Sequence, residues 1–234
     1  VTYIYDISSK KLTEIAPSTV DLLLPSGAEK LDYVLYTDES PYKTQREWLD
    51  RLPFDVYSVN VHTGAKQLIG RNYRTAPKWS MNGKWAVMYD PIAQVWNKFD
   101  GATGKVVNIS DAIGYPMFVE SYDKPAPAPA YGIAGWTADG NNVFLYDAYD
   151  WWKVDLTGER QPECLTKGYG RKHGKSIRKM TSNIDKDVFQ KDETVIVSLW
   201  DKDTMDEGVY QLDMKGRLKK LMEGNYVYTI HRFS

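Results

Sequence analysis

The sequence contains a single cysteine, Cys164, among its 234 residues. An intramolecular disulfide is therefore impossible, and a zinc site built from several cysteines is excluded. No apolar run approaches the ~20 residues that a membrane-spanning helix needs. Neither sign of charge is in excess, because 30 basic side chains balance 31 acidic ones and leave a formal net charge of -1. This balance argues against a surface devoted to nucleic acid or to acidic membranes.

The motifs of enzymatic sites are also missing. A nucleophile elbow needs G-x-S-x-G, and no serine of the sequence has glycine at both required positions. The three histidines, His62, His173 and His231, form neither H-E-x-x-H nor a short ligand pair. Residues 168–176 resemble a phosphate loop, but Tyr169 stands where a Walker A motif requires glycine. We therefore expect no catalytic residue, no cofactor and no metal in this chain.

Aromatic residues are abundant, and they recur in a regular pattern. An aromatic-rich segment, a turn and a second short apolar segment follow one another several times along the chain. The turn glycines of this pattern are Gly64, Gly104, Gly158 and Gly216. Glycine suits such turns because it adopts φ > 0 without a Cβ clash. The repetition predicts a series of antiparallel hairpins, with few helices.

A second pattern precedes two of these hairpins. WSMNGKWAVMYD begins at Trp79, and WTADGNNVFLYD begins at Trp136. Each contains an Asn-Gly or Asp-Gly pair, which is typical of tight hairpin turns, and each ends in Tyr-Asp. The two patterns together supply four short strands per repeat. Four antiparallel strands repeated every ~40–60 residues are typical of the blades of a β-propeller.

We therefore predict an all-β chain that forms a single β-propeller domain, with about four complete four-stranded blades. The complete blades are predicted at residues 21–70, 75–110, 131–166 and 177–223, with partial blades at 1–17 and 225–234. Residues 41–51, PYKTQREWLDR, are the only segment that suits a helical turn or two. Two arrangements stay open for the partial blades. They combine into a shared fifth blade, or the chain is part of a longer ring, which we favour.

Several segments resemble known propellers. The turn WSMNGKWAVM resembles the W-S-P-D-G-K repeat of TolB-type propellers and of the propeller in prolyl oligopeptidase family serine peptidases. Residues 131–172, which begin YGIAGWTADG, and residues 192–228, which begin DETVIVSLWD, resemble parts of large bacterial, dipeptidyl-peptidase-like members of that family. The sequence departs from the repeat at SMNG, where Ser-Pro-Asp-Gly is usual, but Asn82 still supports the turn.

The resemblance implies a non-catalytic propeller that gates access to an α/β-hydrolase domain of the same parent chain and positions peptide substrates for it. It also implies export, for example to the periplasm, which the sequence itself does not fix. An alternative is a stand-alone TolB-like propeller that serves as a protein-binding scaffold. A third reading, a propeller glycosidase or lyase, needs clustered acids or metal ligands around a central channel.

The tryptophans include two candidates for contact with a ligand. Trp79 and Trp136 occupy equivalent positions of the repeat and are expected to pack between blades. Trp151 and Trp152 are adjacent in a predicted strand, so their side chains point to opposite faces. One of these two is expected to be less deeply buried, and it is the better candidate for ligand contact.

Arg171 and Lys172 are the remaining candidates. They belong to a basic stretch between two predicted blades, together with Lys175, Arg178 and Lys179. Such a stretch is most often a solvated loop, and that is the expectation here. The alternative is that it binds an acidic partner or a substrate carboxylate.

Overall fold

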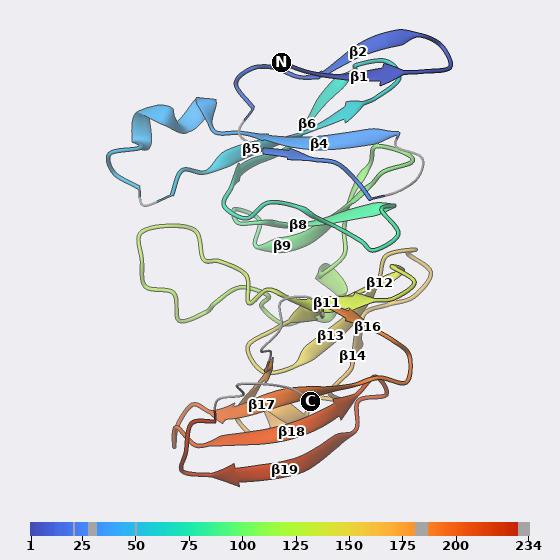
Figure 1. The fold of residues 1–234 in the computed structure, drawn as a ribbon. Helices are drawn as coiled ribbons and strands as arrows, with labels where there is room; N and C mark the ends of the chain where they lie inside the picture. The colour runs from blue at the N-terminus through green and yellow to red at the C-terminus, as the bar shows by residue number, and fades with distance from the viewer. Residues whose placement is uncertain (21, 28–31, 50, 181–186, 229–234) are drawn as a thin grey trace. The chain divides into compact units, whose positions relative to one another are not determined.

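The computed structural model describes residues 1–234 except 21, 28–31, 50, 181–186 and 229–234. Within this part, the chain consists of antiparallel β-sheets joined by turns and a few short helices (Figure 1). It divides into two compact units. Unit 1 comprises Val1–Ile109 and Lys124–Pro129, and unit 2 comprises Ser110–Asp123 and Ala130–Ser234.

Unit 1 contains two four-stranded antiparallel sheets and a separate hairpin. The first sheet has the order β3 (Leu22–Leu24), β4 (Tyr33–Asp38), β5 (Phe54–Asn60) and β6 (Lys66–Tyr73). The second sheet comprises β7 (Lys78–Trp79), β8 (Trp85–Asp90), β9 (Val95–Asp100) and β10 (Val106–Asn108). The hairpin pairs β1 (Thr2–Asp6) with β2 (Lys11–Ala16). Consecutive strands are neighbours in both larger sheets, as in a propeller blade.

Unit 2 contains a four-stranded antiparallel sheet and a five-stranded sheet, which is a four-stranded antiparallel sheet with one added edge strand. One comprises β11 (Ile133–Thr137), β12 (Asn142–Tyr146), β13 (Trp151–Asp155) and β14 (Glu163–Cys164). The other comprises β15 (Lys175–Lys179), β17 (Thr194–Asp201), β18 (Glu207–Asp213) and β19 (Leu218–Gly224). A short strand between β15 and β17, β16 (Val188–Phe189), instead pairs in parallel with β11. Unit 2 also holds η2 (Asp111–Ile113) and the one-turn helix α1 (Tyr169–Lys172).

The prediction of an all-β fold built from four-stranded propeller blades is confirmed. The single-domain arrangement of these sheets stays a prediction. The helical turn expected at 41–51 forms as a 3-10 helix, η1 (Ser40–Gln45), which starts around Pro41 and ends earlier than expected. The terminal strand expected at 225–234 does not form over 225–228, and its remainder, 229–234, lies outside the described residues.

Strand-ending Asp and Asn side chains close many of the hairpin turns. Asp100 Oδ1 accepts hydrogen bonds from the main-chain N–H groups of Ala102 and Thr103, at 2.8 and 3.2 Å. Asn60 plays the same part at the end of β5, where its Oδ1 accepts two main-chain N–H groups at 3.0 Å. The turn glycines that follow, Gly64 and Gly104, have φ values of 75° and 70°. The local sequence therefore determines where each strand reverses.

The WSMNG and WTADG segments form matching turns, one in each unit. Ser80 Oγ donates to Asn82 Oδ1 at 2.8 Å, and Thr137 Oγ1 donates to Asp139 Oδ1 at 2.6 Å. In each turn, the hydroxyl oxygen also accepts the N–H of the residue five positions later, at 3.2 and 3.0 Å. The hydroxyl residue and the following Asn or Asp thus act as one turn motif.

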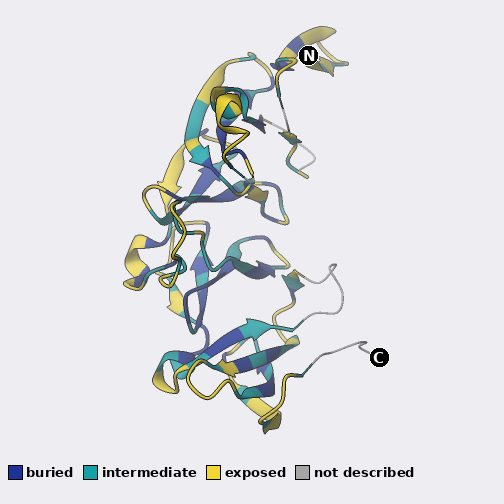
Figure 2. Cartoon of the chain, turned by 90° about the vertical axis from the view of Figure 1, so that its left-hand side faces the viewer, coloured by how far each residue is buried: buried dark blue, intermediate teal, exposed yellow. Residues whose placement is uncertain are grey.

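The strands carry most of the buried residues (Figure 2). In unit 1, one core includes Leu35 and Val56 from the first sheet together with Met88 and Phe99 from the second. Trp79 packs against this core, with its ring meeting Phe99 edge-on at 6.1 Å between centroids. Trp136 is buried in unit 2. The expectation of packing between sheets is confirmed for Trp79, and Trp136 is buried as a packing residue would be.

Candidate functional site

Two buried aspartates organise the turn between β12 and β13. Asp147 and Asp150 are 0% and 1% exposed. Asp147 Oδ1 accepts the main-chain N–H groups of Tyr149 and Asp150, at 2.7 and 2.6 Å. Its Oδ2 accepts Trp152 Nε1–H at 3.0 Å and an Nη2–H of Arg171 at 2.9 Å. Four donors thus share one carboxylate, and such pairing is what makes a buried charge tolerable.

Asp150 fixes the segment that follows β14. Its Oδ1 accepts the hydroxyl of Thr166 at 2.6 Å and the N–H of Gly170 at 2.9 Å, and its Oδ2 accepts the N–H of Arg171 at 3.0 Å. These bonds satisfy main-chain donors of the first turn of α1. A side chain at Gly170 has no room, because a Cβ there would lie 2.6 Å from the carbonyl oxygen of Tyr149. Asp150 therefore determines where α1 lies.

The solvent side of this cluster is both aromatic and cationic. The Arg171 guanidinium lies 3.8 Å from the ring centroid of Tyr115 and 5.0 Å from that of Tyr149. Lys202 Nζ lies 4.4 Å from the same Tyr149 centroid. Tyr115 is 44% exposed, and the Arg171 side chain is 32% exposed. We call Tyr115, Tyr149, Trp152, Arg171 and Lys202 the cationic rim, and its chemistry suits a carboxylate or a planar polar group.

Asp147 also stabilises the charged form of Arg171. Burial acts to lower the pKa of Arg171, but the hydrogen bond and the negative charge of Asp147 outweigh it and raise that pKa. Arg178 lies on the other side of Asp147, where its Nη2 donates to the main-chain oxygen of Asp147 at 2.7 Å. Its guanidinium lies 4.7 Å from the Tyr146 ring centroid, and burial lowers the pKa of Arg178. Arg178 holds the turn, whereas Arg171 reaches solvent.

The structure separates the two candidate tryptophans. Trp151 is 0% exposed and donates its Nε1–H to the main-chain oxygen of Ile177 at 3.2 Å, so it belongs to the core of unit 2. Trp152 is 9% exposed and contacts the rim, with its ring 5.9 Å from that of Tyr115. Lys172, at the end of α1, is exposed. Trp152, Arg171 and Lys172 stay predicted ligand contacts.

The expectation of a solvated basic loop is wrong. Arg171 and Lys172 lie in α1, and Lys175, Arg178 and Lys179 lie in β15. Arg171 pairs with Asp147, Lys175 with Glu223, and Lys179 with Asp187. These acids lie up to 48 positions away in the sequence, so the charge run alone did not reveal them.

The Lys175–Glu223 pair predicts a pH dependence of stability. Glu223 accepts hydrogen bonds from Lys175 Nζ at 2.5 Å and from Lys220 Nζ at 3.1 Å, which lower the pKa of Glu223 from 4.5 to about 2. A pKa lowered by folding stabilises the protein above the unfolded-state value, and this stabilisation is lost as the pH falls from 4.5 towards 2. We expect Glu223→Gln to lower the free energy of unfolding by about 1 kcal/mol at about pH 7, since solvent screens the pair.

The difference in free energy of unfolding between Glu223→Gln and the parent protein should disappear as the pH falls to about 2 and below, because Glu223 itself becomes neutral there. Urea unfolding at several pH values measures it, with the exposed Glu163→Gln as the control. A destabilisation that stays constant with pH would contradict the assignment to this ion pair.

Other candidate chemistry in the described residues is limited. No group of three or more His, Cys, Asp or Glu side chains gathers there in a way that could hold a metal ion. Burial raises the pKa of the Cys164 thiol, whose Sγ accepts the N–H of Gly168 at 3.2 Å. Among the helices of the described ranges, none has the length and apolar character to cross a membrane.

No protein-family profile and no curated protein sequence matches the chain. Among solved structures, it is similar to a putative TolB from Agrobacterium tumefaciens, with 14% identity and a TM-score of 0.41, covering 82% of this chain and 61% of that one. It is also similar to the β-propeller domain of the Trilobed protease from Pyrococcus furiosus, with 13% identity and a TM-score of 0.42, covering 87% of this chain and 58% of that one. A third similar structure is the acylaminoacyl peptidase from Pyrococcus horikoshii, with 13% identity and a TM-score of 0.39, covering 86% of this chain and 32% of that one. The chain spans less than two thirds of each.

Proposed function

We propose that this chain is the non-catalytic propeller region of a prolyl oligopeptidase-like serine peptidase. In this role it gates access to an α/β-hydrolase domain of the same parent chain and positions peptides for cleavage there. The observation that carries the proposal is the pair of matching turns. Ser80–Asn82 and Thr137–Asp139 make the same hydrogen bonds at the same place in two sheets, within the segments that resemble the propeller repeat of these peptidases.

The cationic rim is the part of the chain that we assign to peptide contact. Its arginine is held in place by Asp147 and stacked on Tyr115, so little side-chain freedom is lost when it binds a ligand. A guanidinium donates hydrogen bonds to both peptide carbonyl groups and carboxylates. The rim therefore fits a peptide that carries an acidic side chain or a free carboxyl terminus.

Two experiments test the proposal. The reading frame is expected to continue beyond Ser234 with ~250 residues that contain G-x-S-x-G. In the longer protein, Lys202→Gln should raise KM for acidic peptides by about 3–10-fold and leave kcat unchanged, because it removes an exposed cation of the rim without touching Asp147. Lys215→Gln, at the β18–β19 turn, is the matched control.

The stand-alone TolB-like scaffold is the alternative outcome of these tests. A reading frame without a hydrolase motif, combined with a parent protein that does not cleave peptides, would support the scaffold. Peptide cleavage by the purified chain alone, sensitive to a serine-directed inhibitor, would contradict both, because the chain would then carry its own catalytic residues.

A further inference from the structure

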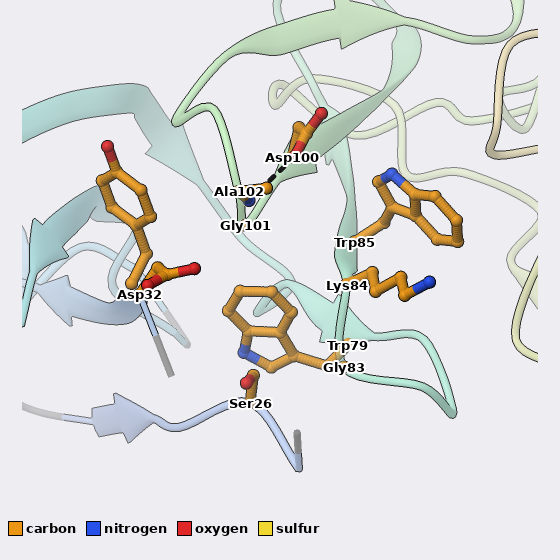
Figure 3. Close-up of a pocket in the computed structure, with 10 residues that line it drawn as sticks. Ser26, Asp32, Trp79, Gly83, Lys84, Trp85, Asp100, Gly101 and Ala102 are labelled. Atoms are coloured by element: carbon orange, nitrogen blue, oxygen red, sulfur yellow. Dashed lines mark hydrogen bonds between the residues drawn. The ribbon is translucent and has the colours of Figure 1, made fainter. Parts of the chain in front are cut away.

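Unit 1 has a cavity of about 350 Å³ beside the WSMNG turn (Figure 3). The lining residues come from the segment before β4, the β7–β8 turn and the turn after β9. They include Asp32, Tyr33, Trp79, Lys84, Trp85 and Asp100. The set combines aromatic rings with two carboxylates.

Two aromatic walls of the cavity are fixed by packing. Trp79 donates its Nε1–H to the main-chain oxygen of Leu24 at 3.0 Å, and its ring lies on Gly101, where an added Cβ would be 3.3 Å from the Trp79 ring. The Tyr33 and Trp79 rings both meet the buried Phe99 edge-on, at 5.7 and 6.1 Å between centroids. These rings offer a preformed apolar surface, so they lose little conformational entropy when a ligand binds.

Among the described residues, the cavity lining carries more acidic than basic side chains. Asp32 and Asp100 both line it, and Lys84 is the one cation in the described part of the lining. In Figure 3 the Lys84 side chain extends away from Trp79 and Asp32. Its Nζ lies 5.9 Å from the ring centroid of Trp85 instead. His62 Nε2 lies 3.2 Å from one oxygen of Asp32, whose side chain is 52% exposed.

Unit 2 has a cavity at the corresponding WTADG turn, and its charge is opposite. This second cavity has a volume of about 360 Å³. Its described lining includes Lys153, Lys191 and Lys215, with Asp139 as the single carboxylate among those residues. The acidic character of the first cavity is therefore not a consequence of the shared turn, and it depends on the particular residues of unit 1.

We propose that the cavity of unit 1 binds the side chain of a lysine or arginine from a peptide. The aliphatic stem of such a side chain packs on Trp79 and Tyr33, and its charged end is attracted by the ring faces and by Asp32 and Asp100. The inference rests on the proposed function for the peptide as partner, and it adds the residue type that the chain recognises. Together with the cationic rim, it gives the chain separate sites for basic and acidic groups.

The test measures binding of short capped peptides to the purified full chain by calorimetry or NMR. An arginine-containing peptide is expected to bind with a Kd of about 0.1–1 mM. The same peptide with citrulline, which has nearly the same shape and no charge, should bind at least about 10-fold more weakly. A higher salt concentration should weaken the binding of the arginine peptide and leave the binding of the citrulline peptide unchanged.

Two variants locate the site. Asp32→Asn/Asp100→Asn should weaken arginine-peptide binding by about 10-fold or more. Asparagine is expected to keep the turn after β9, because Asn60 closes the corresponding turn after β5. Asp155→Asn, a turn-closing carboxylate of unit 2, is the matched control. If the double variant does not fold, the single variant Asp32→Asn replaces it in the same binding measurement.

Several outcomes would overturn the proposal: no binding of the arginine peptide, equal binding of the citrulline peptide, or unchanged affinity in the Asp32 variants. Each is measured on the chain itself, so each is independent of peptide cleavage by a longer protein. A parent protein without peptidase activity whose chain still binds arginine peptides would reject the peptidase proposal and keep this one.

Discussion

Replacing Asp147 with alanine is expected to lower the free energy of unfolding by about 3–5 kcal/mol. The substitution leaves two main-chain N–H groups, the Trp152 indole N–H and the Arg171 guanidinium without their shared acceptor. Much of this network is buried, so water does not replace the carboxylate freely. Urea unfolding followed by tryptophan fluorescence measures the loss.

Two variants show whether burial and charge cause this effect. Asp155→Ala removes a carboxylate that also accepts main-chain N–H groups, but at a hairpin turn near solvent, and about 1 kcal/mol is expected there. Asp147→Asn keeps the size of the side chain and loses the charge that faces Arg171, so an intermediate loss is expected. A loss for Asp147→Ala no larger than that of Asp155→Ala would mean that the network contributes little beyond an ordinary turn.

The sheets were predictable because their signals are local. An Asp or Asn at the end of a strand, followed within four positions by a glycine with φ > 0, specifies a reversal without help from the rest of the chain, as Asn60–Gly64 and Asp100–Gly104 show. The aromatic and β-branched residues between such turns then fall into strands. The same reasoning missed β16, because two residues that join the edge of a distant strand carry no local pattern.

The candidate site was only partly predictable. Trp152 and Arg171 were chosen from sequence, but Asp147, which joins them, was not. The DAYD segment resembles any polar turn after a strand, and its burial arises from packing against α1 and β15. A run of basic residues likewise predicts a solvated segment, because its acidic partners come from distant parts of the sequence. The features that were missed are therefore those that depend on pairing between distant residues, which the spacing of residues in the sequence does not show.

Replacing Trp151 with alanine is expected to destabilise the protein by about 3–5 kcal/mol. Its ring lies between three aromatic neighbours, Phe144, Tyr146 and Phe189, at centroid distances of 6.3, 5.2 and 6.1 Å. Its indole N–H bonds to Ile177, so the same side chain joins the sheet of β13 to the next sheet through β15. Deleting it leaves a cavity that the surrounding rings only partly refill. It also removes one of the two side-chain hydrogen bonds to the Ile177 carbonyl, which keeps the bond that Arg178 Nη1 donates at 2.8 Å.

The control for Trp151→Ala is Trp200→Ala, which deletes an indole that is 36% exposed on β17 and should cost much less. Trp151→Phe separates the two contributions, since it keeps most of the aromatic packing and loses the bond to Ile177. Thermal and urea unfolding of the three variants measure the differences. If Trp151→Ala proved no more harmful than Trp200→Ala, the two sheets of unit 2 would not depend on this side chain, and their packing would have to rest on the aliphatic residues around Ile177 and Leu199.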